Sequence, residues 1–89
     1  MPKFKKDKYF LESSHASLSP GETVAMLREL KHWTQEDLAK ASGIAATNIS
    51  QIENDKLALG KQRAVALGEA LDVHPATLLF PDIPLKKVA

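Results

Sequence analysis

Apolar residues recur at helical spacing in five stretches between residues 19 and 80. In the first stretch Val24, Leu27 and Leu30 follow one another at intervals of three, which is the spacing of residues on one face of a helix. No stretch alternates apolar and polar residues strongly enough for a half-buried strand, apart from a weak trace near the N-terminus. The pattern therefore predicts an all-α domain.

Polar residues and prolines mark where these helices begin. Ser19, Pro20 and Glu22 match a capping box with proline in the first helical position. Thr34 and Asp37 form an acidic variant of that box and predict the start of a second helix. A fourth helix is expected over about 61–71, and Pro75 suits the first turn of a short fifth helix.

The segment 34–56 is the most informative part of the chain, because in it two short helices meet at a glycine. Gly43 can adopt a positive φ without steric cost, so it is expected to end the second helix. The third helix is expected from about residue 45 or 46 to residue 54, with Ile49 and Ile52 facing the core. Most surface helices carry charged residues on their outward side, but this one carries small and polar residues. They are Ala46, Thr47, Ser50 and Gln51. This combination predicts a helix-turn-helix whose second helix enters the major groove of DNA.

Charge is distributed unevenly along the chain. The formal net charge is only +1, and residues 1–18 carry four lysines against two acids. Residues 19–85 carry six cations against nine acids, so the expected folded body is slightly acidic. An indiscriminate nucleic-acid binder needs many phosphate contacts. The balance argues against that class, although a DNA reader can still work with a few cations on one face.

The composition also limits the chemistry that we expect. The chain has no cysteine, which excludes disulfides and thiolate metal sites and fits a cytoplasmic protein. The three histidines have no ligand spacing, and no nucleophile–base pair or glycine-rich phosphate loop is present. We therefore expect no cofactor, no metal and no enzymatic activity. No apolar run is long enough to span a membrane, and none resembles a signal peptide.

Three parts of the chain are expected: a basic arm over 1–18, a helix-turn-helix domain over 19–80 and a tail over 81–89. The arm combines lysines with apolar residues, namely Phe4, Tyr9, Phe10 and Leu11. Such an arm is either a flexible terminus or a segment that becomes ordered on a partner or on a second subunit. Both alternatives stay open from the sequence.

Four segments carry a resemblance to a known family. They are T-Q-E-D-L-A at 34–39, S-G-I at 42–44, I-S-Q-I-E-N at 49–54 and A-L-x-V at 70–73. Together they make the chain resemble the Cro/CI-type helix-turn-helix family of phage repressors, also called the XRE family, over about residues 19–80. The resemblance implies a five-helix, lambda-repressor-like DNA-binding domain.

The resemblance also implies roles for particular residues. The base-reading positions are Ala46, Thr47, Ser50 and Gln51. The positions that contact DNA phosphates are Gln35, Asn48, Asn54 and Lys56, with Lys61 or Arg63 adding a further contact. Glu53 matches a structural position that pairs within the fold. Two residues depart from the family pattern, since Ala46 replaces a longer polar reader and Asp55 replaces a usual glycine.

The family resemblance and these residue roles are compatible with two functions. The first is a sequence-specific, repressor-like transcriptional regulator that binds double-stranded DNA as a homodimer on a palindromic operator. The alternative is an antitoxin that binds a toxin protein through the arm and represses its own operon. The C-terminal segment also carries a group of apolar residues, which either form the dimer interface or close the core of the monomer. These residues are Leu78, Leu79, Phe80, Ile83 and Leu85.

Overall fold

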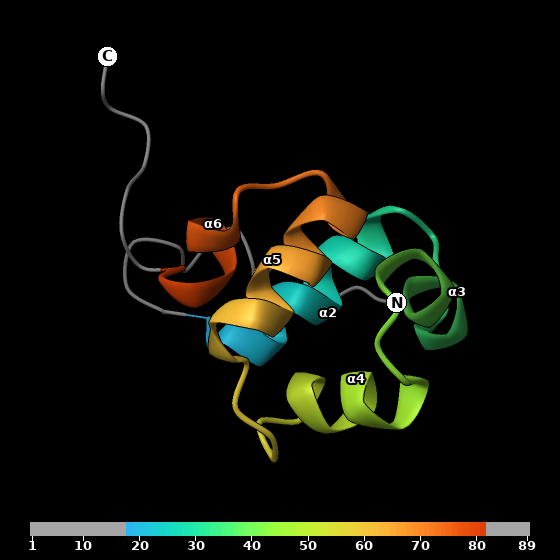
Figure 1. Ribbon diagram of the computed structural model, residues 1–89, viewed down its shortest axis with the longest axis horizontal. Coiled ribbons are helices and arrows are strands. Elements are labelled where there is room, and N and C mark those ends of the chain that lie inside the picture. The colour runs from blue at the N-terminus through green and yellow to red at the C-terminus, as the bar shows by residue number, and fades with distance from the viewer. Residues whose placement is uncertain (1–17, 82–89) are drawn as a thin grey trace.

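The computed structural model describes residues 18–81, and within them the chain forms five helices and no strand. The helices are α2 (Pro20–Leu30), α3 (Gln35–Ser42), α4 (Ala46–Glu53), α5 (Gly60–Leu71) and α6 (Pro75–Leu79). Helix α2 contacts α4, α5 and α6, while α3 contacts α4 and α5. Figure 1 shows α5 lying over α2 along a similar direction, with α4 at one edge of the molecule. The predicted all-α architecture of five helices is confirmed.

The helix ends follow the predicted capping residues. The Ser19 hydroxyl accepts a hydrogen bond from the Glu22 backbone N–H, and the Glu22 carboxylate accepts one from the Ser19 backbone N–H, each at 3.0 Å. Thr34 and Asp37 form the same reciprocal pair at the start of α3. Gly43 ends α3 in the left-handed region, with φ of 80°. These contacts satisfy backbone groups that a helix end otherwise leaves unpaired.

The capping box at Thr34 makes α3 sensitive to acid. The backbone N–H of Thr34, and in second place its side chain, hydrogen-bond to Asp37 and lower the pKa of that carboxyl below its ordinary 3.8. Since the folded-state pKa is the lower one, the ionised cap stabilises the fold above pH 3.8, and this contribution is lost as the pH falls further. Thermal unfolding of wild type and Asp37→Asn as a function of pH measures this contribution. The difference between their Tm values should be constant near neutral pH and should shrink in acid. An equal difference at about pH 3 and at pH 7 would contradict this role of the carboxylate.

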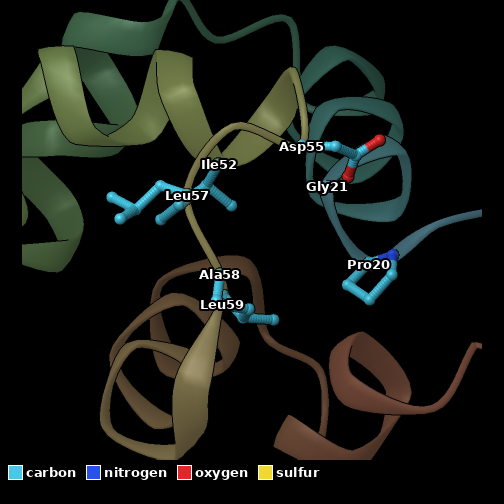
Figure 2. A pocket seen from close by; sticks show the side chains of 7 residues that line it. All are labelled: Pro20, Gly21, Ile52, Asp55, Leu57, Ala58 and Leu59. Carbon is cyan, nitrogen blue, oxygen red and sulfur yellow. The ribbon is translucent and has the colours of Figure 1, made fainter.

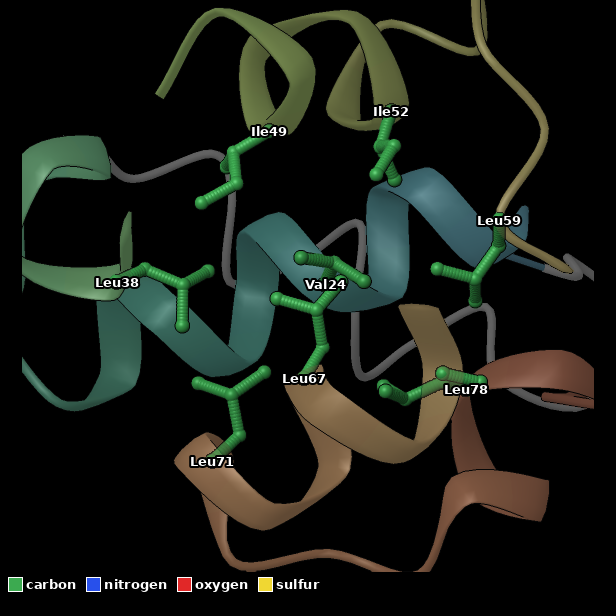
Figure 3. Close-up of a cluster of buried hydrophobic side chains, with 9 residues drawn as sticks. Val24, Leu38, Ile49, Ile52, Leu59, Leu67, Leu71 and Leu78 are labelled. Atoms are coloured by element: carbon green, nitrogen blue, oxygen red, sulfur yellow. The ribbon is translucent and has the colours of Figure 1, made fainter. Parts of the chain in front are cut away.

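The hydrophobic core lies where α2 meets the other helices, as Figure 3 shows. Its buried side chains are Val24, Leu38, Ile49, Ile52, Leu59, Ala64, Leu67, Leu71 and Leu78. Leu30 departs from the predicted apolar stripe, since 67 % of its surface is exposed. Each step of three residues falls about 60° short of a full helical turn. Leu30 therefore lies about 120° around the helix from Val24, on the solvent side.

The C-terminal apolar residues were predicted either to close the core or to form a dimer interface, and they differ in their burial. Leu78 is fully buried and closes the core, and Leu79 packs against that core. Phe80 has 54 % of its surface exposed, so of the three it alone is available as a large apolar contact for a partner. Ile83 and Leu85 lie outside the described residues, as do residues 1–17 of the arm.

The start of α2 packs directly on the end of α4. Figure 2 shows Gly21 beside Ile52 and Asp55, at a shallow pocket of about 250 Å³. A Cβ atom at Gly21 would overlap the backbone carbonyl oxygen of Ile52, so only glycine fits without a shift of the backbone. The Ser19 hydroxyl also donates a hydrogen bond to the Asp55 carboxylate at 3.0 Å. Both contacts hold the C-terminal turn of α4 against α2.

Candidate nucleic-acid interface

The corner between α3 and α4 has the geometry that its glycine predicts. The left-handed Gly43 reverses the chain, and the Ile44 backbone N–H then donates to the Ser42 hydroxyl at 3.1 Å. The Ile44 side chain packs against the core. The corner therefore fixes where α4 begins relative to α3.

One side of α4 is free to meet a ligand. Thr47 and Gln51 are exposed, while Ala46 and Ser50 are half-buried. At 100° per residue these four positions span about 140° of the helix, opposite the buried Ile49 and Ile52. The structure therefore brings the four predicted base-reading residues together on one side of α4. Figure 1 shows that this helix lies at the edge of the molecule.

Helix α4 has few stabilising features of its own. Ala45 occupies the N-cap position and has no side-chain acceptor for the first backbone N–H groups. The first turn of α4 contains no acidic residue, and its last turn contains no basic residue. The helix dipole is therefore not complemented by side-chain charge at either end of α4. The burial of Ile49 and Ile52 therefore holds this short helix in place.

The loop after α4 folds back on that helix and presents Lys56. Asp55 takes the left-handed conformation with φ of 61°, so it replaces the family's usual glycine without loss of the turn. The backbone N–H groups of Lys56 and Leu57 both donate to the Gln51 carbonyl, at 2.8 and 3.2 Å. The Asn54 side-chain amide donates to the Ser50 carbonyl at 2.9 Å. Asn54 and Lys56 are both exposed beside the end of α4.

The remaining predicted phosphate contacts are spread over three helices. Gln35 is the first residue of α3, and its side-chain amide donates to Glu53 at 2.9 Å. Asn48 is half-buried on α4. Lys61 is exposed at the start of α5, and the Arg63 guanidinium donates to the Ala58 carbonyl at 3.2 Å. Arg63 is thus partly engaged within the loop that precedes α5.

A largely buried ion pair joins α2 to α4. The Arg28 Nε and Nη2 atoms donate to the two Glu53 carboxylate oxygens at 2.8 and 3.0 Å, and Nη1 donates to the Trp33 carbonyl at 2.8 Å. The two side chains are only 13 % and 6 % exposed. Hydrogen bonding to Glu53 raises the pKa of the Arg28 guanidinium. The expected pairing of Glu53 within the fold is confirmed, whereas the sequence did not identify Arg28 as its partner.

A model of the helix-turn-helix family matches residues 24–78 of the chain. The chain belongs to the helix-turn-helix family. The match covers α3, the glycine corner, α4 and α5, together with most of α2 and α6. The predicted XRE-type family and its lambda-repressor-like fold are confirmed.

Three solved structures have a similar fold. The P22 c2 repressor, crystallised with synthetic operator 9T and Tl⁺, shares 30 % identity with a TM-score of 0.67, over 72 % of this chain and 97 % of its own. The restriction-modification controller protein C.AhdI from Aeromonas hydrophila shares 27 % identity with a TM-score of 0.65, over 70 % and 94 %. A hypothetical transcription factor, NHTF from Neisseria, has the same fold at 24 % identity and a TM-score of 0.66, over 76 % and 78 %. No curated protein matches the sequence significantly.

The helix-turn-helix family and this fold are those of DNA-binding transcriptional regulators. Among residues 18–81, no group of three histidine or acidic side chains could hold a metal ion. Over the same residues, no helix has the length and apolar character needed to cross a bilayer.

Proposed function

We propose that this helix-turn-helix protein is a sequence-specific transcriptional repressor that binds a palindromic operator as a homodimer. The observation that carries the proposal is the uncharged outward face of α4, which is held at the edge of the molecule by a buried opposite face. A neutral polar helix face can enter the major groove and hydrogen-bond to base edges. The similarity to the P22 c2 repressor, which was crystallised with a synthetic operator, supports operator DNA as the ligand.

The exposed residues of α4 suit direct readout. The Gln51 carboxamide can form two hydrogen bonds with the N6 and N7 atoms of adenine, and Thr47 can hydrogen-bond to a base or contact a thymine methyl. Ser50 can donate or accept one hydrogen bond. Ala46 limits its own contact to apolar surface, such as a thymine methyl group.

Phosphate contacts would fix the register of α4 in the groove. Gln35 contacts Glu53 at the end of α4, and Lys56 follows that end. Asn48 lies on α4 and Asn54 just after it. Lys61 and Arg63 extend this set along the start of α5. Such contacts position the protein but read no sequence.

Homodimerisation is proposed on energetic grounds. About three base contacts at roughly 1–3 kcal/mol each give one subunit limited discrimination. Two subunits related by a two-fold axis would read two half-sites about 34 Å apart. The exposed Phe80, at the end of α6, is an apolar residue available for such an interface.

The base-reading role of Gln51 predicts a loss of specificity on substitution. Gln51→Ala should weaken binding to the cognate operator by about 1–3 kcal/mol and leave non-specific binding nearly unchanged. As the matched control, Lys56→Ala should weaken binding to every sequence and lower the slope of log K against log salt by about one. Fluorescence anisotropy at several salt concentrations measures both effects. An equal loss on all sequences for Gln51→Ala would reassign this residue to the DNA backbone.

Selection from random duplex DNA with the purified protein tests the whole proposal. Recovery of a palindromic consensus is expected, because a symmetric dimer reads the same half-site twice. Failure to enrich any sequence would refute sequence-specific binding. The antitoxin alternative depends on the arm, of which residues 1–17 lie outside the described residues, and it stays a prediction.

A further inference from the structure

The Glu53 carboxylate lies where α2, α3 and α4 meet, and it is 6 % exposed. Its Oε2 atom accepts from Arg28 Nε at 2.8 Å. Its Oε1 atom accepts from Arg28 Nη2 at 3.0 Å and from Gln35 Nε2 at 2.9 Å. One buried carboxylate therefore joins a structural arginine to the residue proposed to contact DNA phosphate.

These contacts determine which way the Gln35 amide faces. An ionised carboxylate can only accept hydrogen bonds, so Gln35 must present its NH₂ group to Glu53 and not its carbonyl oxygen. The planar fork of Arg28 fixes the carboxylate in turn, because two parallel hydrogen bonds leave it little freedom to rotate. The Gln35 amide is held in one of its two flip states.

The orientation of this amide matters for a phosphate ligand. Phosphate oxygens also only accept hydrogen bonds, so an amide that turned its carbonyl outward would repel them. The NH₂ group carries two hydrogens, and Glu53 uses one. The second remains for a phosphate at the N-terminus of α3, where the helix dipole also favours an anion. Since Arg28 neutralises Glu53, the carboxylate adds no net negative charge beside that phosphate.

We propose that Glu53 is a positioning residue for DNA binding, which fixes Gln35 so that one amide nitrogen donates both to Glu53 and to a DNA phosphate. This inference rests on the proposed function and adds a coupling between α4 and the phosphate contact of α3. A purely structural role for the Arg28–Glu53 pair would give no such coupling, because the contribution of Gln35 to affinity would then be independent of residue 53.

Two matched double variants separate these roles. Arg28→Met/Glu53→Gln keeps a hydrogen-bond acceptor for Gln35, whereas Arg28→Met/Glu53→Met has a side chain of similar size without an amide acceptor. Each is combined with Gln35→Ala, and binding to one mixed-sequence duplex is measured at fixed low salt. Gln35→Ala should weaken binding roughly tenfold in wild type and in the Glu53→Gln background, but less than about twofold in the Glu53→Met background. An equal loss in all three backgrounds would overturn the inference.

Side-chain NMR of the wild-type protein tests the same point without any destabilising substitution. In the free protein the Gln35 amide proton that donates to Glu53 should lie downfield of its position in an ordinary glutamine side chain, and added duplex should move the other proton. Ordinary shifts for both protons in the free protein, or equal movement of both on adding duplex, would overturn the inference. If wild type binds no duplex at all, the proposed function fails and this inference with it. Binding with an uncoupled Gln35 refutes only the positioning role.

Discussion

Arg28→Met should lower the free energy of unfolding by about 3–5 kcal/mol, which is the largest effect that we expect from a single substitution. The variant leaves the Glu53 carboxylate buried without its cation, at 6 % exposure. It also removes the donor that the Trp33 carbonyl uses between α2 and α3. Desolvation of an unpaired charge accounts for most of the expected loss.

Urea unfolding followed by circular dichroism measures this change, and Arg28→Met/Glu53→Met is its control. Removing both charges should recover most of the lost stability, because a buried ion pair gains little over apolar residues of similar size. In thermal unfolding the single variant should melt well below wild type, since each kcal/mol shifts Tm by about 4–8 °C in a domain of this size. A loss below about 1 kcal/mol would mean that water reaches Glu53 in the variant.

Gly21→Ala should destabilise the protein by about 3 kcal/mol, at the upper end of the range for overpacking. Alanine normally stabilises a helix relative to glycine, by about 1 kcal/mol. Here the added methyl group would overlap the Ile52 carbonyl oxygen, and the atom it meets is backbone that cannot rotate away. The start of α2 would have to move from the end of α4, so the expected sign is opposite to that of helix propensity.

Gly43→Ala provides a comparison of different physical origin. A Cβ atom there would meet nothing within 4 Å, but φ is 80°, so the cost is backbone strain alone at about 1–2 kcal/mol. Gly43→Asn should recover part of it, because asparagine tolerates the left-handed region. At position 21, by contrast, asparagine should recover none of the stability that alanine loses, because the cost there is steric overlap. A stabilising effect of Gly21→Ala would contradict the close approach of α2 and α4.

Local sequence signals predicted the parts of this fold that depend on neighbouring residues. The capping boxes at Ser19 and Thr34 and the left-handed Gly43 all form as expected, because each depends on groups within four positions. The outward face of α4 was predictable for the same reason, since helical periodicity alone sets which side opposes Ile49 and Ile52.

Contacts between distant residues were not predictable in this way. Arg28 and Glu53 are 25 residues apart, and Ser19 and Asp55 are 36 apart. No local pattern specifies that these side chains meet, because their pairing depends on how α2 crosses the end of α4. The position of Arg28 near the end of α2 therefore gives no sign of its pair with Glu53.

The weak ends of α4 have a consequence for engineering. An isolated peptide of residues 45–54 would be mostly unfolded in water, because eight helical residues without a side-chain cap cannot offset the entropy of nucleation. The shape of the reading face therefore belongs to the whole domain, and grafting this sequence onto another scaffold would transfer its side chains without their arrangement. A transplant would also need the surfaces that receive Ile49, Ile52 and Glu53.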